Sequence, residues 1–120
     1  LARGVLTGTR KQDDWTATSR GRTDDFAHAL YGAPGDFEIV DRCVSLAARR
    51  GVPPSQVALA WLLAKGVTAP ILGTTKLDQL EQAIGGLDLT LDASEMSWLE
   101  ERYQPHPVLG ISGSADSAAK

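Results

Sequence analysis

A short apolar run that ends in glycine, two threonines and a lysine constrains the fold of this chain more than any other segment. The run is Pro70-Ile71-Leu72, and Gly73-Thr74-Thr75-Lys76 follows it directly. Beyond it, leucine and isoleucine recur at steps of three and four, which indicates one face of a helix: Leu77, Leu80, Ile84 and Leu87. A strand that passes through glycine into a helix presents free backbone N–H groups and the positive end of the helix dipole. Such a turn either binds phosphate or is a plain β-to-α turn with a solvated lysine, and the local pattern leaves both open.

Three further helices are predicted from apolar spacing and from residues typical of helix ends. The first begins at Asp36 and is closed by Gly51, and the second opens at Pro53-Pro54 and ends at Gly66. The third begins at Asp92, in the pattern of a capping box. We interpret Trp61 as core packing rather than as a ring that stacks on a nucleotide. The predicted buried faces are Phe37, Val40, Val44 and Ala47; Val57, Ala58, Trp61 and Leu62; and Met96, Leu99 and Tyr103.

Composition and charge exclude several classes of function. The 120 residues are 42% hydrophobic and 22% charged, with a net charge of -3, so a nucleic-acid partner is not expected. No apolar run approaches the roughly 20 residues that span a bilayer, so a membrane partner is not expected either. Cys43 is the single cysteine, which rules out an internal disulfide and a multi-cysteine zinc site, and we expect a buried, inert thiol. His28 and His106 lack metal-ligand or triad spacing, so no metal is expected.

The segment from Thr9 to Gly35 shows no sustained period and is rich in polar residues. A connection of this length usually means a functional lid or disorder. Residues 1–22 hold five basic and two acidic residues, a local balance of +3 in a chain of net charge -3. This part is either a solvated loop with scattered charges or a loop that folds over phosphate groups.

Three segments resemble motifs of the aldo-keto reductase family, in the family's order and spacing. Residues Leu1-Ala2-Arg3-Gly4-Val5-Leu6-Thr7-Gly8 resemble the motif that follows the seventh barrel strand. Residues 53–62, which read PPSQVALAWL, resemble the helix before the eighth strand. Residues 70–76, with Gln79 and Leu80, resemble the last strand and helix, where the family grips the adenosine end of NADP(H). The resemblance extends from Leu1 to about Leu109.

The resemblance implies an α/β fold, the (β/α)₈ or TIM barrel, which needs on the order of 250 residues. A chain of 120 residues that begins where the seventh strand ends is expected to be the C-terminal part of such a barrel. We therefore expect a mostly helical chain with one or two short strands, an incomplete domain over residues 1–109, and a disordered tail over 110–120. The chain is interpreted as a fragment or a truncated product.

The resemblance also implies a function, namely an oxidoreductase that uses NADPH to reduce aldehydes or ketones in the cytoplasm. The family's catalytic aspartate, tyrosine, lysine and histidine lie on earlier strands, and nothing here matches their motifs. No catalytic residue is therefore assigned, and the isolated chain is predicted to be inactive. A small-molecule carbonyl substrate would bind only through the full-length parent.

The family's cofactor-binding positions, unlike its catalytic ones, have matching residues in this chain. The resemblance places the backbone of residues 1, 2 and 4 near the pyrophosphate and residue 7 near a phosphate. It places the turn at residues 73–76 at the 2′-phosphate, and an arginine from the long loop over the cofactor. Where many family members have Glu-Asn, this chain has Gln82-Ala83, and only Gln82 can hydrogen-bond adenine. The candidate cofactor-binding residues are Leu1, Ala2, Gly4, Thr7, Arg20, Gly73, Thr75, Lys76, Gln79 and Gln82.

Two other functional classes stay open. The chain could be a catalytically inactive module that binds a nucleotide phosphate. It could also be a structural fragment that becomes ordered only by self-association or by pairing with the missing half of the barrel, since open sheet edges recruit partners.

Overall fold

The computed structural model describes residues 1–8 and 29–105. In chain order, its elements are η1 (Ala2–Thr7), α2 (Pro34–Arg50), α3 (Pro54–Ala64), α4 (Leu77–Ile84), η3 (Gly85–Leu87) and α5 (Ala93–Glu100). The helices predicted from spacing and end residues are all present, and the expectation of a mostly helical chain is confirmed. Arg20, most of the long loop, both histidines and the tail lie outside the described residues.

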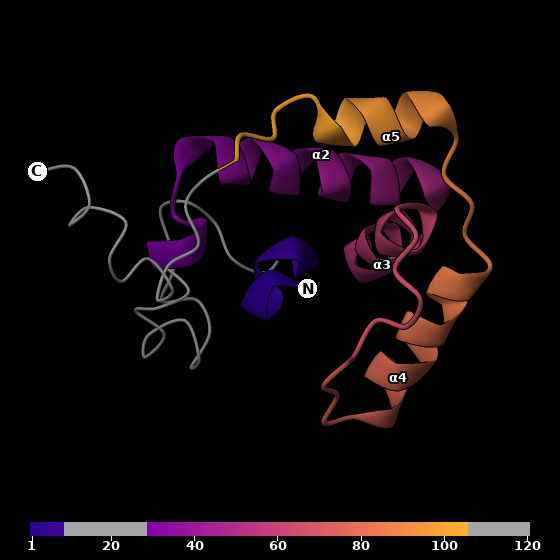
Figure 1. The fold of residues 1–120 in the computed structure, drawn as a ribbon. Helices are drawn as coiled ribbons and strands as arrows, with labels where there is room; N and C mark the ends of the chain where they lie inside the picture. Colours follow the sequence, from indigo (N-terminus) through magenta and orange to yellow (C-terminus); the bar gives the residue numbers. More distant parts are fainter. Residues whose placement is uncertain (9–28, 106–120) are drawn as a thin grey trace, which may run out of the picture.

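The helices are stacked in the order α5, α2, α3 and α4 (Figure 1). The last helix, α5, lies along α2, and α3 packs on another side of α2. The short α4 packs against α3, away from α2, and η1 packs against both α2 and α3. Since α3 contacts the elements on either side of it, it is the central support of the structure.

Local hydrogen bonds explain where the helices begin and end. The Asp92 carboxylate accepts hydrogen bonds from the N–H groups of Ser94 and Glu95, at 2.8 and 2.9 Å. The Glu95 carboxylate accepts from the N–H of Asp92 at 2.9 Å, so the predicted capping box is confirmed. At the end of α2, Gly51 has a φ of 67°, which glycine adopts without the strain that a Cβ brings.

The core lies between α2, α3 and α5. Leu46 and Val57 are its most buried large side chains, and Leu99 closes it from α5. Cys43 is 3% exposed, which confirms the buried thiol, and its Sγ donates to the carbonyl oxygen of Pro54 at 3.4 Å. Burial raises the pKa of the Cys43 thiol to about 11, so it stays protonated and unreactive near neutral pH.

Three arginines of α2 hold α5 in place. Arg50 binds the Glu95 carboxylate through two hydrogen bonds of 2.7 and 2.6 Å. Arg42 forms an ion pair of 2.5 Å with Glu101 and also donates to the carbonyl oxygen of Trp98. The guanidinium groups of Arg49 and Arg42 lie 4.8 and 5.3 Å from the centre of a Trp98 ring, within cation–π distance. These contacts join helices that are far apart in the sequence.

The expectation of one or two short strands is wrong for the described residues, which contain no strand. Residues 69–74 belong to no helix or strand, and Ile71 is 99% exposed. A strand needs a neighbour that pairs with its N–H and C=O groups, and none lies beside this segment within the part that the structure describes. The α/β barrel architecture is therefore not visible in residues 1–8 and 29–105.

Some predicted buried faces also need correction. The apolar face of α4 and η3 is exposed, because α4 turns only Ala83 fully inward onto α3. Tyr103 lies beyond the end of α5 and is 62% exposed, and Val44 is 37% exposed. The exposed fractions on α4 and η3 are 70% for Leu77, 40% for Leu80, 54% for Ile84 and 69% for Leu87.

Candidate cofactor-phosphate site

The turn that precedes α4 presents polar groups to solvent. Gly73, Thr75 and Lys76 are all exposed, and Lys76 has an extended backbone at the N-cap position. No side chain from the cap position satisfies the first N–H groups of α4. An open helix N-terminus of this kind carries a partial positive charge and hydrogen-bond donors, which suits an anion.

Gln79 connects this turn to the helix. Its Oε1 accepts a hydrogen bond from the N–H of Thr75 at 3.4 Å, a long contact one turn apart. Asp78 also lies in the first turn of α4. Its carboxylate interacts favourably with the positive end of the helix dipole, but it repels an incoming anion. Lys76 is therefore needed to give the turn a positive side chain.

The second group of candidate residues lies in η1. Ala2 and Arg3 have φ angles of 48° and 54°, in the left-handed region that L-residues with a Cβ rarely adopt, and Gly4 follows at 92°. Residues held in such conformations cluster at ligand sites. The N–H of Gly4 donates to the carbonyl of Leu1 at 2.9 Å, and the Thr7 hydroxyl donates to the carbonyl of Gly4 at 2.6 Å. Gly4 is thus committed to hydrogen bonds within η1.

The structure keeps these two groups apart. Leu1, Ala2, Gly4 and Thr7 lie with η1 against α2 and α3, while the turn and Gln79 lie with α4 on another side of α3 (Figure 1). Gln82 is exposed on α4, and Arg20 is outside the described residues. The predicted site residues therefore form two clusters that share only α3 as a support.

Gln56 of α3 is a residue that the sequence reasoning missed. Its Nε2 donates to the backbone carbonyl of Gln82 at 2.6 Å and so ties α3 to α4. The signal that could have found it is a single glutamine at the start of an apolar helix, together with the Gly85-Gly86 pair that packs beside it.

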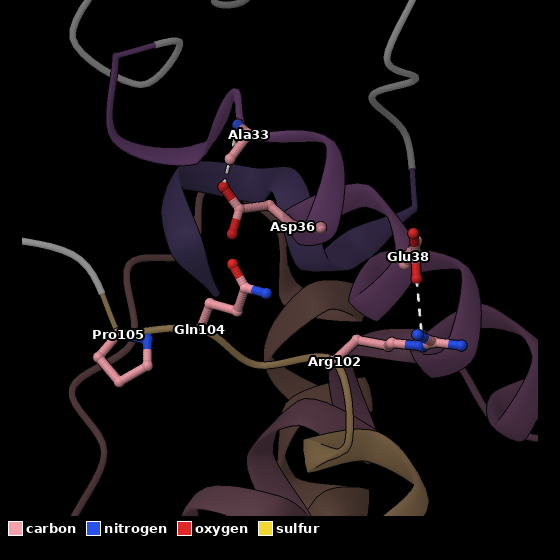
Figure 2. Close-up of a pocket in the computed structure, with 7 residues that line it drawn as sticks. Ala33, Asp36, Glu38, Arg102, Gln104 and Pro105 are labelled. Atoms are coloured by element: carbon pink, nitrogen blue, oxygen red, sulfur yellow. Dashed lines mark hydrogen bonds and ion pairs between the residues drawn. The ribbon is translucent and has the colours of Figure 1, made fainter.

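A hollow of about 420 Å³ lies at the N-terminus of α2, between that helix and the residues after α5 (Figure 2). Its charged groups already have partners. Arg102 Nε lies 3.3 Å from the Glu38 carboxylate, and the Asp36 carboxylate accepts from the N–H of Ala33 at 3.1 Å. The Gln104 amide points toward Asp36 from the opposite wall (Figure 2). The charged side chains of the hollow are thus paired with groups in its own wall, and none of the candidate cofactor residues lines it.

A smaller apolar hollow of about 130 Å³ separates α3 from α4. It adjoins the exposed apolar face of α4 and offers no polar side chain for chemistry. The residues that line it are Leu59, Leu63, Pro70, Leu72, Ala83, Ile84, Gly86 and Leu87.

Two kinds of feature are absent from residues 1–8 and 29–105. They contain no group of three or more histidine, cysteine, aspartate or glutamate side chains that could hold a metal ion. Nor does any of their helices have the length and apolar character needed to cross a bilayer.

In a comparison with protein families, residues 1–104 match the model of the aldo/keto reductase family. A Schizosaccharomyces pombe protein provisionally named an aryl-alcohol dehydrogenase is 37% identical over 110 residues, which are 92% of this chain and 30% of that protein. The versiconal hemiacetal acetate reductase of Aspergillus parasiticus is 34% identical over 113 residues, which are 90% of this chain and 32% of that protein. An aldo-keto reductase of Fusarium vanettenii is 43% identical over 75 residues, 62% of this chain and 20% of that protein. The chain thus spans about a third or less of the length of these relatives.

Proposed function

Because this chain belongs to the aldo/keto reductase family, an oxidoreductase family, we propose that it supplies the part of an NADPH-dependent carbonyl reductase that binds the phosphate and adenosine end of the cofactor. The observation that carries the proposal is the exposed turn before α4. There an uncapped helix N-terminus, the Thr75 hydroxyl and the Lys76 ammonium lie together at the surface. This set of donors fits a phosphate group in charge and in hydrogen-bonding capacity.

Each residue of the turn has a distinct role in this proposal. Lys76 supplies a positive charge to the 2′-phosphate, and Thr75 supplies a hydroxyl. Gln79 lines the adenosine pocket, and Gln82 hydrogen-bonds adenine. Lysine acts as a point charge and lacks the bidentate geometry of arginine, so the preference for NADPH over NADH should be modest.

The residues of η1 complete the proposed site. Ala2 and Arg3 hold a strained left-handed backbone, which supports a role for this turn beside the pyrophosphate. Leu1, Gly4 and Thr7 belong to the same turn, and Arg20 is proposed to close over the cofactor from the long loop. Because the two clusters lie on different sides of α3, the complete site forms only when η1 and the α4 turn are brought to face one ligand.

The chemistry of the whole protein is a further part of the proposal. NADPH supplies the hydride that reduces an aldehyde or ketone. Nothing in this chain matches the motifs of the family's catalytic tetrad, so the chain binds and orients the cofactor but does not transfer a proton. We propose that the carbonyl substrate, like the cytoplasmic location, belongs to the full-length protein.

A titration of the chain with NADPH, repeated with NADH, tests the binding function. Tryptophan fluorescence reports binding, and Lys76→Ala is the variant that removes the proposed phosphate contact. We expect saturable binding, with NADPH preferred and with that preference lost in the variant. Absence of NADPH binding in the wild-type chain would refute the proposal that this part forms a cofactor half-site.

A second function is favoured by the exposed apolar face of α4 and η3. Leu77 is 70% exposed and Leu87 is 69% exposed, which is unusual for residues at helical spacing. A chain that orders fully only on self-association or on pairing with the rest of the barrel would bury this face. Sedimentation velocity over a hundredfold concentration range would show an increase in the mean sedimentation coefficient in that case, and a constant monomer value otherwise.

A further inference from the structure

The orientation of the α4 turn depends on how α4 is held to α3. Helix α3 packs against η1, α4 and η3, so it relates the two clusters of candidate residues. Helices α3 and α4 are in contact, and apolar side chains from both line the hollow between them, with Leu59 and Leu63 on α3 and Ala83 and Ile84 on α4. Apolar contacts of this kind tolerate sliding, because they have no directional preference.

Gln56 supplies the directional contact. Within residues 29–105, the bond of 2.6 Å from Gln56 Nε2 to the carbonyl oxygen of Gln82 is the one side-chain hydrogen bond between α3 and α4. Gln82 lies in the last turn of α4, where backbone carbonyls lose their helical partners. The side chain therefore acts as a C-terminal cap that is donated by another helix.

The glycine pair after α4 leaves the space that this contact needs. A Cβ at Gly85 would lie 2.4 Å from Gln56 Nε2, and a Cβ at Gly86 would lie 3.3 Å from the Cβ of Leu59. Gly85 has a φ of -58°, which any residue adopts, so its need for glycine is one of space and not of backbone conformation. Gln56 and Gly85 are thus complementary in shape.

We infer that Gln56 is a positioning residue for the cofactor-phosphate turn. The eight residues of α4 form a rod of about 12 Å, so a shift at its C-terminal end also moves its first turn. Gln79 carries that shift to the turn itself through its hydrogen bond with the N–H of Thr75. This inference rests on the proposed function of the turn, and it assigns Gln56 an effect on the 2′-phosphate contact without any contact to the cofactor.

The first test replaces Gln56 in the full 120-residue chain. Gln56→Met keeps the length of the side chain and removes the donor, while Gln56→Glu places a carboxylate against the Gln82 carbonyl. We expect the dissociation constant for NADPH to rise about fivefold and that for NADH to change little, as expected for the loss of one aligned hydrogen bond. Equal weakening of both nucleotides, with or without loss of helical circular dichroism, would make Gln56 a residue of general stability and overturn the inference.

The second test uses the close approach of Gln56 to Gly85. Gly85→Ala should displace the Gln56 amide and reduce the preference for NADPH as Gln56→Met does. Gly35→Ala is the matched control, since its new Cβ would meet only the carbonyl oxygen of Arg102 at 3.8 Å, an ordinary contact. The double variant Gln56→Ala/Gly85→Ala should be no worse than Gln56→Ala alone, because the collision has been removed. Effects that simply add would contradict the inference.

The two proposals fail in different ways. A wild-type chain that binds no NADPH overturns the proposed function and this inference together. A wild-type chain that prefers NADPH, with the same preference in Gln56→Met and Gly85→Ala, overturns the inference alone.

Discussion

Arg50 and Glu95 form a two-pronged ion pair that joins the end of α2 to the start of α5. Nε of Arg50 lies 2.7 Å from Oε1 of Glu95, and Nη2 lies 2.6 Å from Oε2. The same carboxylate accepts the N–H of Asp92 at 2.9 Å, so one side chain caps its own helix and binds a distant one. This arrangement makes the attachment of α5 dependent on the charge of Glu95.

We predict that the structure loses stability as the pH falls below the range where Glu95 is ionised. The hydrogen bond from Arg50, followed by that from the Asp92 N–H, lowers the pKa of Glu95 below its ordinary value of 4.5. A group with a lowered folded-state pKa stabilises the fold above its unfolded value, and that stabilisation is lost as the pH falls through the folded value. The melting temperature, followed by circular dichroism, should therefore fall progressively as the pH drops below about 4.5. Glu95→Gln should flatten this dependence, whereas Glu81→Gln, on the exposed surface of α4, should leave it intact.

Shortening a buried side chain of α2 should lower the free energy of unfolding far more than shortening an exposed apolar side chain of η3. Leu46 is 1% exposed and Leu87 is 69% exposed. Leu46→Ala should lower the free energy of unfolding by about 2–5 kcal/mol, since it removes buried methyl groups and leaves a cavity. Leu87→Ala should change it by less than about 0.5 kcal/mol. Urea denaturation measures both, and a comparable loss in the two variants would mean that the α4 face is buried in solution.

Cys43 should resist thiol reagents in the folded chain. Burial raises the pKa of its thiol to about 11, so almost none is present as thiolate at pH 8. The expected result is no reaction with Ellman's reagent in native buffer and stoichiometric reaction in concentrated urea. Rapid native-state labelling would contradict the packing of α2 against α3.

Gly8 should be the least replaceable of the described glycines with a positive φ. Its φ is 73°, and a Cβ there would lie 2.7 Å from Cγ2 of Val44. Gly51 has a similar φ of 67° but open space around it, so it provides the control for backbone strain alone. Gly51→Ala should cost about 1 kcal/mol of unfolding free energy, and Gly8→Ala should cost more. Adding Val44→Ala to Gly8→Ala should recover the difference, and failure to recover it would exclude the collision as the cause.

The positions of the helices were predictable because helix signals are local. Proline at the start of α3, Gly51 after α2 and the capping box at Asp92 act within one turn of the chain, and each is found where the sequence indicates. The burial of Cys43 was predictable for the same reason, since it follows from helical spacing. The family motifs could also be recognised in the sequence, and they indicated the candidate cofactor residues but not their arrangement.

How these helices face one another depends on contacts between segments that are distant in the sequence. The apolar run at residues 70–72 predicts a strand. A strand is stabilised by neighbouring strands, however, and the described residues provide none. The helical spacing of the apolar residues on α4 predicts a buried face. Burial also needs a second element that packs against this face, and local spacing does not show whether one is present. The contact between Gln56 and Gln82 joins residues 26 positions apart, and only folding brings them together. Local sequence signals are therefore sufficient to predict the helices and the residue types of the candidate site. The tertiary structure determined which faces meet, because packing and cross-helix hydrogen bonds arise only between segments distant in the chain.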